Sequence, residues 1–125
     1  MNLDKVISGF FIILAMTVNF GFFYGDMNSL EHHSKYELLA AIIINLIATT
    51  LKLGDKTQMG SVLLATSLVA DIQLIAAASV WTIAAYAYTV DTEIVATIVS
   101  LSGGALLANL VSVMLYIGDT LKSKR

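Results

Sequence analysis

Three polar residues lie in otherwise apolar stretches of the sequence, namely Asp71, Asn45 and Asn109. A carboxylate and two amides at such positions could bind a cation or a proton. Counted along ideal helices at about 1.5 Å per residue, all three fall in the central part of a bilayer. A carboxylate there costs about 2.5–3.5 kcal/mol on insertion scales, so it lines a cavity, finds a partner or holds a proton. The three side chains therefore predict an intramembrane site for an inorganic cation or a proton.

Three further polar residues are candidates to line that site. Thr49 and Lys52 follow Asn45 at helical spacing, which places the three on one face of a helix, and Ser112 follows Asn109 on another. Residues at such spacing would form a continuous polar track beside the carboxylate.

Asp71 lies about 16 Å along its helix, too deep for its short side chain to reach the headgroups. We expect it to face polar groups, with Asn45 or Asn109 nearby, and not lipid. Lys52 is the one cation within reach, at a distance too long for a direct pair unless its side chain bends inward. The same residues also fit a purely structural role, because interhelical hydrogen bonds of this kind contribute about 0.6–2 kcal/mol each.

The composition indicates that these helices lie in a membrane and not in water. Of 125 residues, 58% are hydrophobic and 13% are charged, against about 45–50% and about 25% in soluble domains. The absence of cysteine excludes disulfides, thiolate metal sites and cysteine nucleophiles, and a net charge of −2 gives no indication of nucleic acid. The sequence has no catalytic triad, phosphate-binding loop or metal motif, and the adjacent His32 and His33 lack metal-ligand spacing. We therefore expect neither an enzyme nor a cofactor.

Four apolar segments are long enough to cross a bilayer, which needs roughly 20 helical residues. They predict an all-α, integral membrane four-helix bundle, a single domain over residues 1–125, with spans at about 6–24, 36–53, 60–88 and 93–117. Six of the seven cations fall on one side of this arrangement, and only Lys35 falls on the other. The positive-inside rule then places both termini in the cytoplasm, as expected of a multi-pass protein in a bacterial inner membrane.

The second and fourth segments share a pattern. Residues 45–55 line up with residues 109–119, with Asn-Leu at the start, Leu five positions on and Gly-Asp at the end. The pattern predicts a duplicated helical hairpin, although chance similarity between apolar helices also produces such matches. Either origin predicts that Gly54 and Gly118 end their helices, because that position favours the left-handed geometry of glycine.

A small residue recurs at every fourth position of the last segment, at Ala96, Ser100, Gly104 and Ala108. Such a stripe allows another helix to approach closely. That helix belongs either to the same bundle or to a second copy of the chain. Because four helices bury little area among themselves, we expect a homo-oligomer.

The whole chain resembles a family of small bacterial inner-membrane proteins to which no function is assigned. The residues that carry the resemblance are 19–23, 45–55, 63–71 and 101–105. It implies a membrane location and no mechanism. Residues 48–55 also resemble the potassium-channel filter string Ala-Thr-Thr-Val-Gly-Tyr-Gly-Asp, but a lysine and a leucine replace its first glycine and its tyrosine, and the repeat explains the string better.

Two hypotheses for function follow from these observations. The first is a small oligomeric channel or transporter for a cation or proton, with Asp71 as its intramembrane acid. The second is a non-transporting accessory or scaffold protein that binds another membrane protein through the small-residue stripe. A water-filled path that reaches Asp71 is the feature that would distinguish them.

Overall fold

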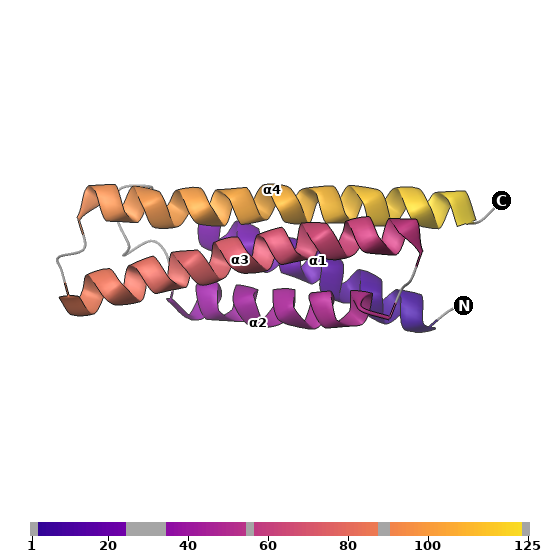
Figure 1. The fold of residues 1–125 in the computed structure, drawn as a ribbon, viewed down its shortest axis with the longest axis horizontal. Helices are drawn as coiled ribbons and strands as arrows, with labels where there is room; N and C mark the ends of the chain where they lie inside the picture. The colour runs from indigo at the N-terminus through magenta and orange to yellow at the C-terminus, as the bar shows by residue number, and fades with distance from the viewer. Residues whose placement is uncertain (1–2, 25–34, 55–56, 88–90, 124–125) are drawn as a thin grey trace.

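Helices account for nearly all of the chain that the structure, a computed structural model, describes, which is residues 3–24, 35–54, 57–87 and 91–123. They are α1 (Leu3–Phe23), α2 (Lys35–Lys52), α3 (Gln58–Ala87) and α4 (Thr92–Ser123), and these described residues include no strand (Figure 1). The expectation of an all-α bundle of four helices is thereby confirmed.

Short polar side chains begin the two longest helices. The Thr57 hydroxyl accepts a hydrogen bond from the Gly60 amide at 3.0 Å ahead of α3, and the Asp91 carboxylate accepts one from the Ile94 amide at 2.9 Å ahead of α4. Such caps satisfy amides that have no partner within the helix and contribute about 1 kcal/mol each. Because the sequence has no proline, nothing interrupts these helices over 30 and 32 residues.

Gly118 does not end its helix, so that prediction was wrong. α4 continues to Ser123, past residue 117 where the fourth span was expected to end, and no described glycine has a left-handed φ. A glycine inside a helix costs only about 1 kcal/mol relative to alanine. Contacts with α1 offset that cost, since the Tyr116 hydroxyl donates to the Lys5 carbonyl at 2.6 Å. Gly54 does follow α2, in a turn, but without left-handed geometry.

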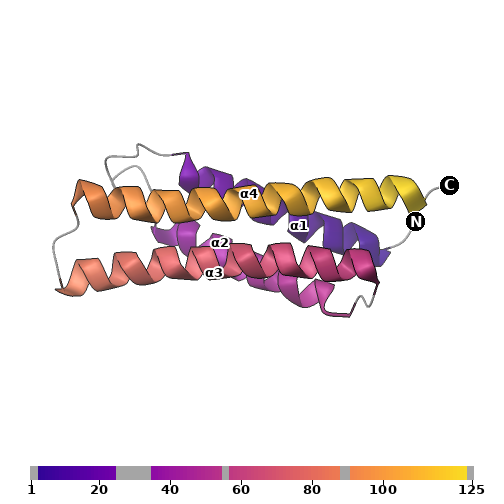
Figure 2. The ribbon, with the colours of Figure 1, turned by 45° about the horizontal axis from the view of Figure 1, so that its top comes forward.

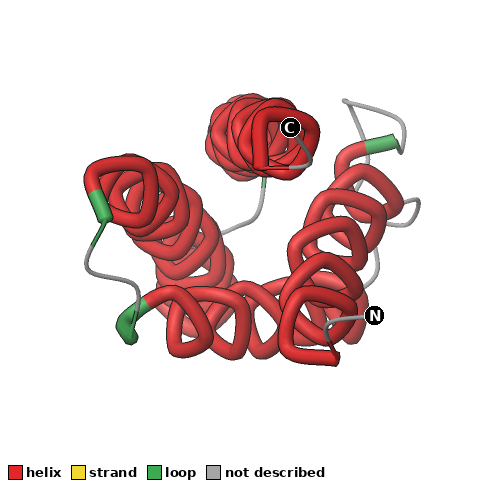
Figure 3. Tube along the Cα trace, turned by 90° about the vertical axis from the view of Figure 1, so that its right-hand side faces the viewer, coloured by secondary structure: helices red, strands yellow, loops and turns green. Residues whose placement is uncertain are grey.

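Consecutive helices run antiparallel, and each packs against two others. α1 contacts α2 and α4, and α3 contacts the same two, so the bundle closes on itself (Figure 3). One end of the bundle, which we call the terminal end, holds the starts of α1 and α3 and the ends of α2 and α4 (Figure 1). At the opposite end, the far end, α3 and α4 extend beyond α1 and α2 (Figure 2).

Polar side chains lie inside this bundle beside an apolar core, and many large apolar side chains lie on its outside, where a soluble protein is mainly polar. Nine polar or charged residues are buried in the part of the chain that the structure describes, whereas α1 alone exposes Val6, Phe10 and Phe20. α1, α3 and α4 are long and apolar enough to cross a membrane, and α2 is not among them, since its 18 residues include three charged side chains. An exterior of this kind is suited to contact with lipid and not with water.

Five of the six buried positions of α2 recur in α4 at the separation of Asn45 from Asn109; the sixth, Lys52, corresponds to the half-buried Tyr116. The first set is Leu38, Ala41, Asn45, Ala48 and Thr49, and the second is Ser102, Ala105, Asn109, Ser112 and Val113. The two helices thus present equivalent faces, in the same register, to the bundle interior. The duplication of a helical hairpin requires such a correspondence.

Candidate functional site

Lys52 ends α2 with its side chain turned into the bundle. It is only 6% exposed, and its ammonium donates to the Ser67 hydroxyl, to the Ser112 hydroxyl at 3.2 Å and to the Leu63 carbonyl at 3.3 Å. An ammonium has three N–H donors, so all of them are satisfied within the protein. Lys52 therefore links α2 to both α3 and α4. Its side chain bends into the bundle, which is the direction that an approach to Asp71 requires.

Asp71 follows Ser67 by one helical turn and is 5% exposed, at the fourteenth of the 30 residues of α3. Its Oδ2 accepts a hydrogen bond from the Thr49 hydroxyl at 2.5 Å. Its other oxygen, Oδ1, is buried and has no hydrogen-bond partner among the residues that the structure describes. An unsatisfied buried acceptor costs about 1–3 kcal/mol, and the charge of Lys52, which interacts with Asp71 electrostatically, offsets part of that cost.

We call Thr49, Lys52, Ser67, Asp71 and Ser112 the charged cluster. Towards the terminal end it adjoins a cavity of about 170 Å³, room for several water molecules at about 30 Å³ each. Side chains of all four helices line this cavity, among them Asp4, Lys5, Lys52, Leu63, Tyr116 and Asp119. Lys52 thus stands at the boundary between the cluster and a space open at the terminal end.

Beyond Asp71, in the direction of the far end, the buried residues that follow on α3 are apolar. Leu74 and Ala77 follow on α3 and pack in one buried core with Phe22 of α1, Leu38 of α2 and the first half of α4. None of these side chains donates or accepts a hydrogen bond. The polar path that begins at the terminal end therefore ends at Asp71.

A second polar cluster lies between α1 and α4 and carries no charge. We call its members, Asn19, Ser102 and Asn109, the neutral cluster. With its amide oriented so that both ends find partners, Asn19 donates to the Ser102 carbonyl at 3.2 Å and accepts from Asn109 Nδ2 at 3.2 Å and from the Leu106 backbone amide at 2.8 Å. Because both ends of the Asn19 amide are paired, this cluster has the properties of interhelical hydrogen bonding that holds helices together.

The structure separates residues that the sequence grouped. Asp71 belongs to the charged cluster and Asn109 to the neutral cluster, while the Asn45 side chain donates to a carbonyl of its own helix at 2.8 Å. The hydrogen-bond partner of Asp71 is Thr49, one turn from Asn45. The three residues expected to line the site, Thr49, Lys52 and Ser112, do come together around it.

The small-residue stripe of α4 lies partly inside the same bundle. A Cβ added at Gly104 would lie 2.7 Å from Oε1 of Gln73 on α3, and Ala108 packs against the apolar core. Ser100 is exposed and Ala96 is half-buried. The stripe therefore serves packing within one chain and does not by itself require a second copy. A homo-oligomer stays a prediction, and Gly104→Leu would disturb the α3–α4 contact first.

Two residues of the clusters were missed from the sequence, although each carried a signal. Asn19 lies within the first apolar segment, as Asn45 and Asn109 lie within theirs. Ser67 precedes Asp71 by four residues, which places both on one face of a helix. Helical periodicity applied to every polar residue of the spans would have found both.

Antiparallel helices with an apolar exterior and polar groups inside define the class of this protein, a helical bundle with a membrane-type surface. The chain belongs to the family of unknown function DUF6394, whose profile matches residues 32–120. That range holds the whole charged cluster, whereas Asn19 of the neutral cluster lies outside it. Searches among curated proteins and among solved structures gave no match.

Proposed function

We propose that this chain is a small membrane channel or transporter that moves protons, with Asp71 as the proton-binding group. It would lie in a bacterial inner membrane with its terminal end, and the cavity there, facing the cytoplasm. The observation that carries the proposal is the Asp71 carboxylate itself, buried in mid-helix with one oxygen unpaired and an ammonium nearby. An apolar side chain would pack at this place without the insertion cost of an acid.

Thr49 gives Asp71 a hydrogen-bonded partner in both protonation states. The Thr49 hydroxyl has one hydrogen and lies 2.5 Å from Asp71 Oδ2 and 2.8 Å from the Asn45 carbonyl. When Asp71 is ionised, Thr49 donates to the carboxylate. When Asp71 is protonated, the acid donates to the Thr49 oxygen and the Thr49 hydrogen turns to the Asn45 carbonyl. A carboxyl that is hydrogen-bonded in both forms is suited to bind and release a proton.

A proton fits the charged cluster better than a metal cation does. The Lys52 ammonium already occupies the cluster and repels a second cation. Within the described ranges, no group of three or more His, Cys, Asp or Glu side chains is placed to hold a metal ion. Cations such as Mg²⁺ and Ca²⁺ need about six or more oxygen ligands, whereas a proton needs one acceptor, and Asp71 supplies it.

The charged cluster supports proton access from the terminal end. Hydroxyl groups both donate and accept hydrogen bonds, and those of Thr66, Ser67 and Ser112 lie between the cavity and Asp71, with Thr66 and Ser112 2.5 Å apart. Release at the far end requires that α3 move relative to its neighbours, because the apolar core closes that side. In this proposal the described state is the one in which Asp71 exchanges protons with the terminal end.

Proton flux into liposomes that contain the purified protein tests the proposal. Native protein should carry protons down an imposed gradient, and Asp71→Asn, which keeps the side-chain shape, should lower the rate by about tenfold or more. Asn109→Ala is the matched control, since it alters a residue of similar burial in the neutral cluster and should keep the native rate. Equal rates for native protein and folded Asp71→Asn would overturn the proposal.

The second candidate function is that of an accessory protein that binds another membrane protein without transport. The closed far half of the bundle favours it, because a one-sided polar path does not conduct. Asp71 and Lys52 would then hold the helices in register. In that case purified protein gives no flux above that of empty liposomes, and Asp71→Asn changes stability alone.

A further inference from the structure

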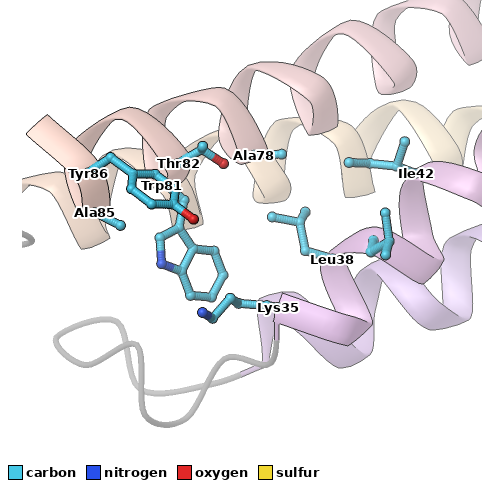
Figure 4. A pocket seen from close by; sticks show the side chains of 9 residues that line it. Lys35, Leu38, Ile42, Ala78, Trp81, Thr82, Ala85 and Tyr86 are labelled. Atoms are coloured by element: carbon cyan, nitrogen blue, oxygen red, sulfur yellow. The ribbon is translucent and has the colours of Figure 1, made fainter.

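A groove lies between α2 and α3 near the far end, away from both polar clusters (Figure 4). Its volume is about 490 Å³. Leu38, Leu39 and Ile42 of α2 form one wall, and Ala78 and Ala85 of α3 form the other. Leu39 is 55% exposed, so the groove opens on the outer surface of the bundle.

The polar groups of the groove gather at one end of it. Figure 4 shows the Lys35 ammonium beside the Trp81 ring, with Tyr86 close by, whereas Leu38, Ile42 and Ala78 lie towards the opposite end. Tryptophan and tyrosine are typical of the interface between lipid tails and water. The groove is thus amphipathic along its length, with a cation where a headgroup would lie.

A second cavity continues the groove along the α2–α3 boundary. Its volume is about 330 Å³, and it shares Ile42, Ala78 and Thr82 with the first cavity before it reaches Ile75. From Tyr86 to Ile75, α3 rises about 16 Å, a length that an acyl chain can follow. Together the two cavities form a continuous apolar track below a single cation.

We propose that this groove binds an anionic phospholipid, with the phosphate at Lys35 and an acyl chain along the track to Ile75. Charge complementarity identifies the ligand, since among the lysines that the structure describes Lys35 alone lies at the far end. The apolar walls exclude free phosphate as the preferred ligand. The track ends at Ile75, one turn of α3 beyond Asp71, so a bound chain would rest against the helix that carries the acid.

Native mass spectrometry of the full chain in mild detergent tests this proposal with phosphatidylglycerol, phosphatidylcholine and inorganic phosphate as probes. Native protein should bind phosphatidylglycerol more tightly than phosphatidylcholine. Lys35→Gln should weaken phosphatidylglycerol binding about fivefold, the change that about 1 kcal/mol per lysine gives, and should remove the preference. Lys122→Gln, at an exposed lysine of the terminal end, should leave binding unchanged.

Three outcomes of the lipid comparison, and a fourth of the phosphate competition, would overturn the lipid site. The first three are equal affinity of native protein for the two lipids, an unchanged preference in Lys35→Gln, and a preference lost equally in Lys122→Gln. Competition by inorganic phosphate at the same site would also contradict it, since the apolar track would then contribute nothing. Because Lys35 is exposed, the variant should fold as the native chain does.

Discussion

The charged cluster and the neutral cluster are both buried between helices and hold different chemistry. The charged cluster joins α2 to α3 and, through Ser112, to α4, whereas the neutral cluster joins α4 to α1. In the repeat, Lys52 corresponds to Tyr116. The amide of Asn19 is hydrogen-bonded at both ends, whereas one oxygen of Asp71 has no partner among the described residues.

This comparison teaches that the bundle does not need charge in order to join its helices. Amides and backbone groups alone join α1 to α4 in the neutral cluster. The acid and the ammonium of the charged cluster therefore add something that helix packing does not require. We take the acid and the ammonium of the charged cluster as the functional part of the molecule.

The largest stability effect should come from Lys52→Met. It removes one hydrogen-bond donor from each of three oxygens and leaves the Asp71 charge without its cation, and should lower the free energy of unfolding by about 2–3 kcal/mol. Tyr116→Phe, the corresponding change in the other half, removes one hydrogen bond and should cost about 1 kcal/mol. Unfolding by SDS in mixed micelles, followed by circular dichroism, measures both. Equal losses of unfolding free energy in the two variants would show that Lys52 contributes no more to stability than the Tyr116 hydroxyl does.

The effects of Lys52→Met and Asp71→Asn should not add. When both charges are absent, neither is left uncompensated, so the double variant should be about 1 kcal/mol more stable than the sum of the single changes predicts. The same unfolding assay gives this double-mutant cycle. Strict additivity would mean that the two groups act independently, against the electrostatic interaction between them.

In the neutral cluster, Asn109→Ala should lower the free energy of unfolding by about 0.6–1 kcal/mol, because one interhelical hydrogen bond to Asn19 is lost. Helix content should be unchanged, and so should proton flux. A loss as large as that of Lys52→Met would remove the distinction between the clusters.

The smallest effect concerns the two glycines of the repeat. A Cβ at Gly118 or at Gly54 would meet nothing within 4 Å. Gly118 lies inside α4, so Gly118→Ala should stabilise the protein by about 0.4–1 kcal/mol. Gly54 lies outside α2, and Gly54→Ala should change stability by less. Thermal unfolding of the two variants side by side measures the difference, and a larger gain for Gly54→Ala would contradict the helix limits.

The helices were predictable from the sequence because long apolar segments and polar breaks are local signals. Asp71 was predictable as a candidate because a carboxylate in such a segment is costly wherever it faces. The partners of Asp71 were not predictable, since they depend on how four helices rotate and pack. Asn45 and Asn109 share its depth, but rotation turns one to its own backbone and the other to α1.

The side chain of Lys52 shows a second limit of sequence reasoning. The sequence places Lys52 at a helix end, as a possible lining residue that would approach Asp71 only if its side chain bent inward. Two serines and a carbonyl draw the ammonium inward. These acceptors come from α3 and α4, and no sequence pattern close to Lys52 predicts them.

Infrared difference spectra between acid and alkaline conditions, recorded on native protein and Asp71→Asn in liposomes, test the central claim most directly. If Asp71 binds and releases protons within the charged cluster, native protein should show a carboxyl C=O band that Asp71→Asn lacks and that Asn109→Ala retains. Identical spectra for native protein and Asp71→Asn would show that Asp71 does not change its protonation, and would contradict its role as the proton-binding group.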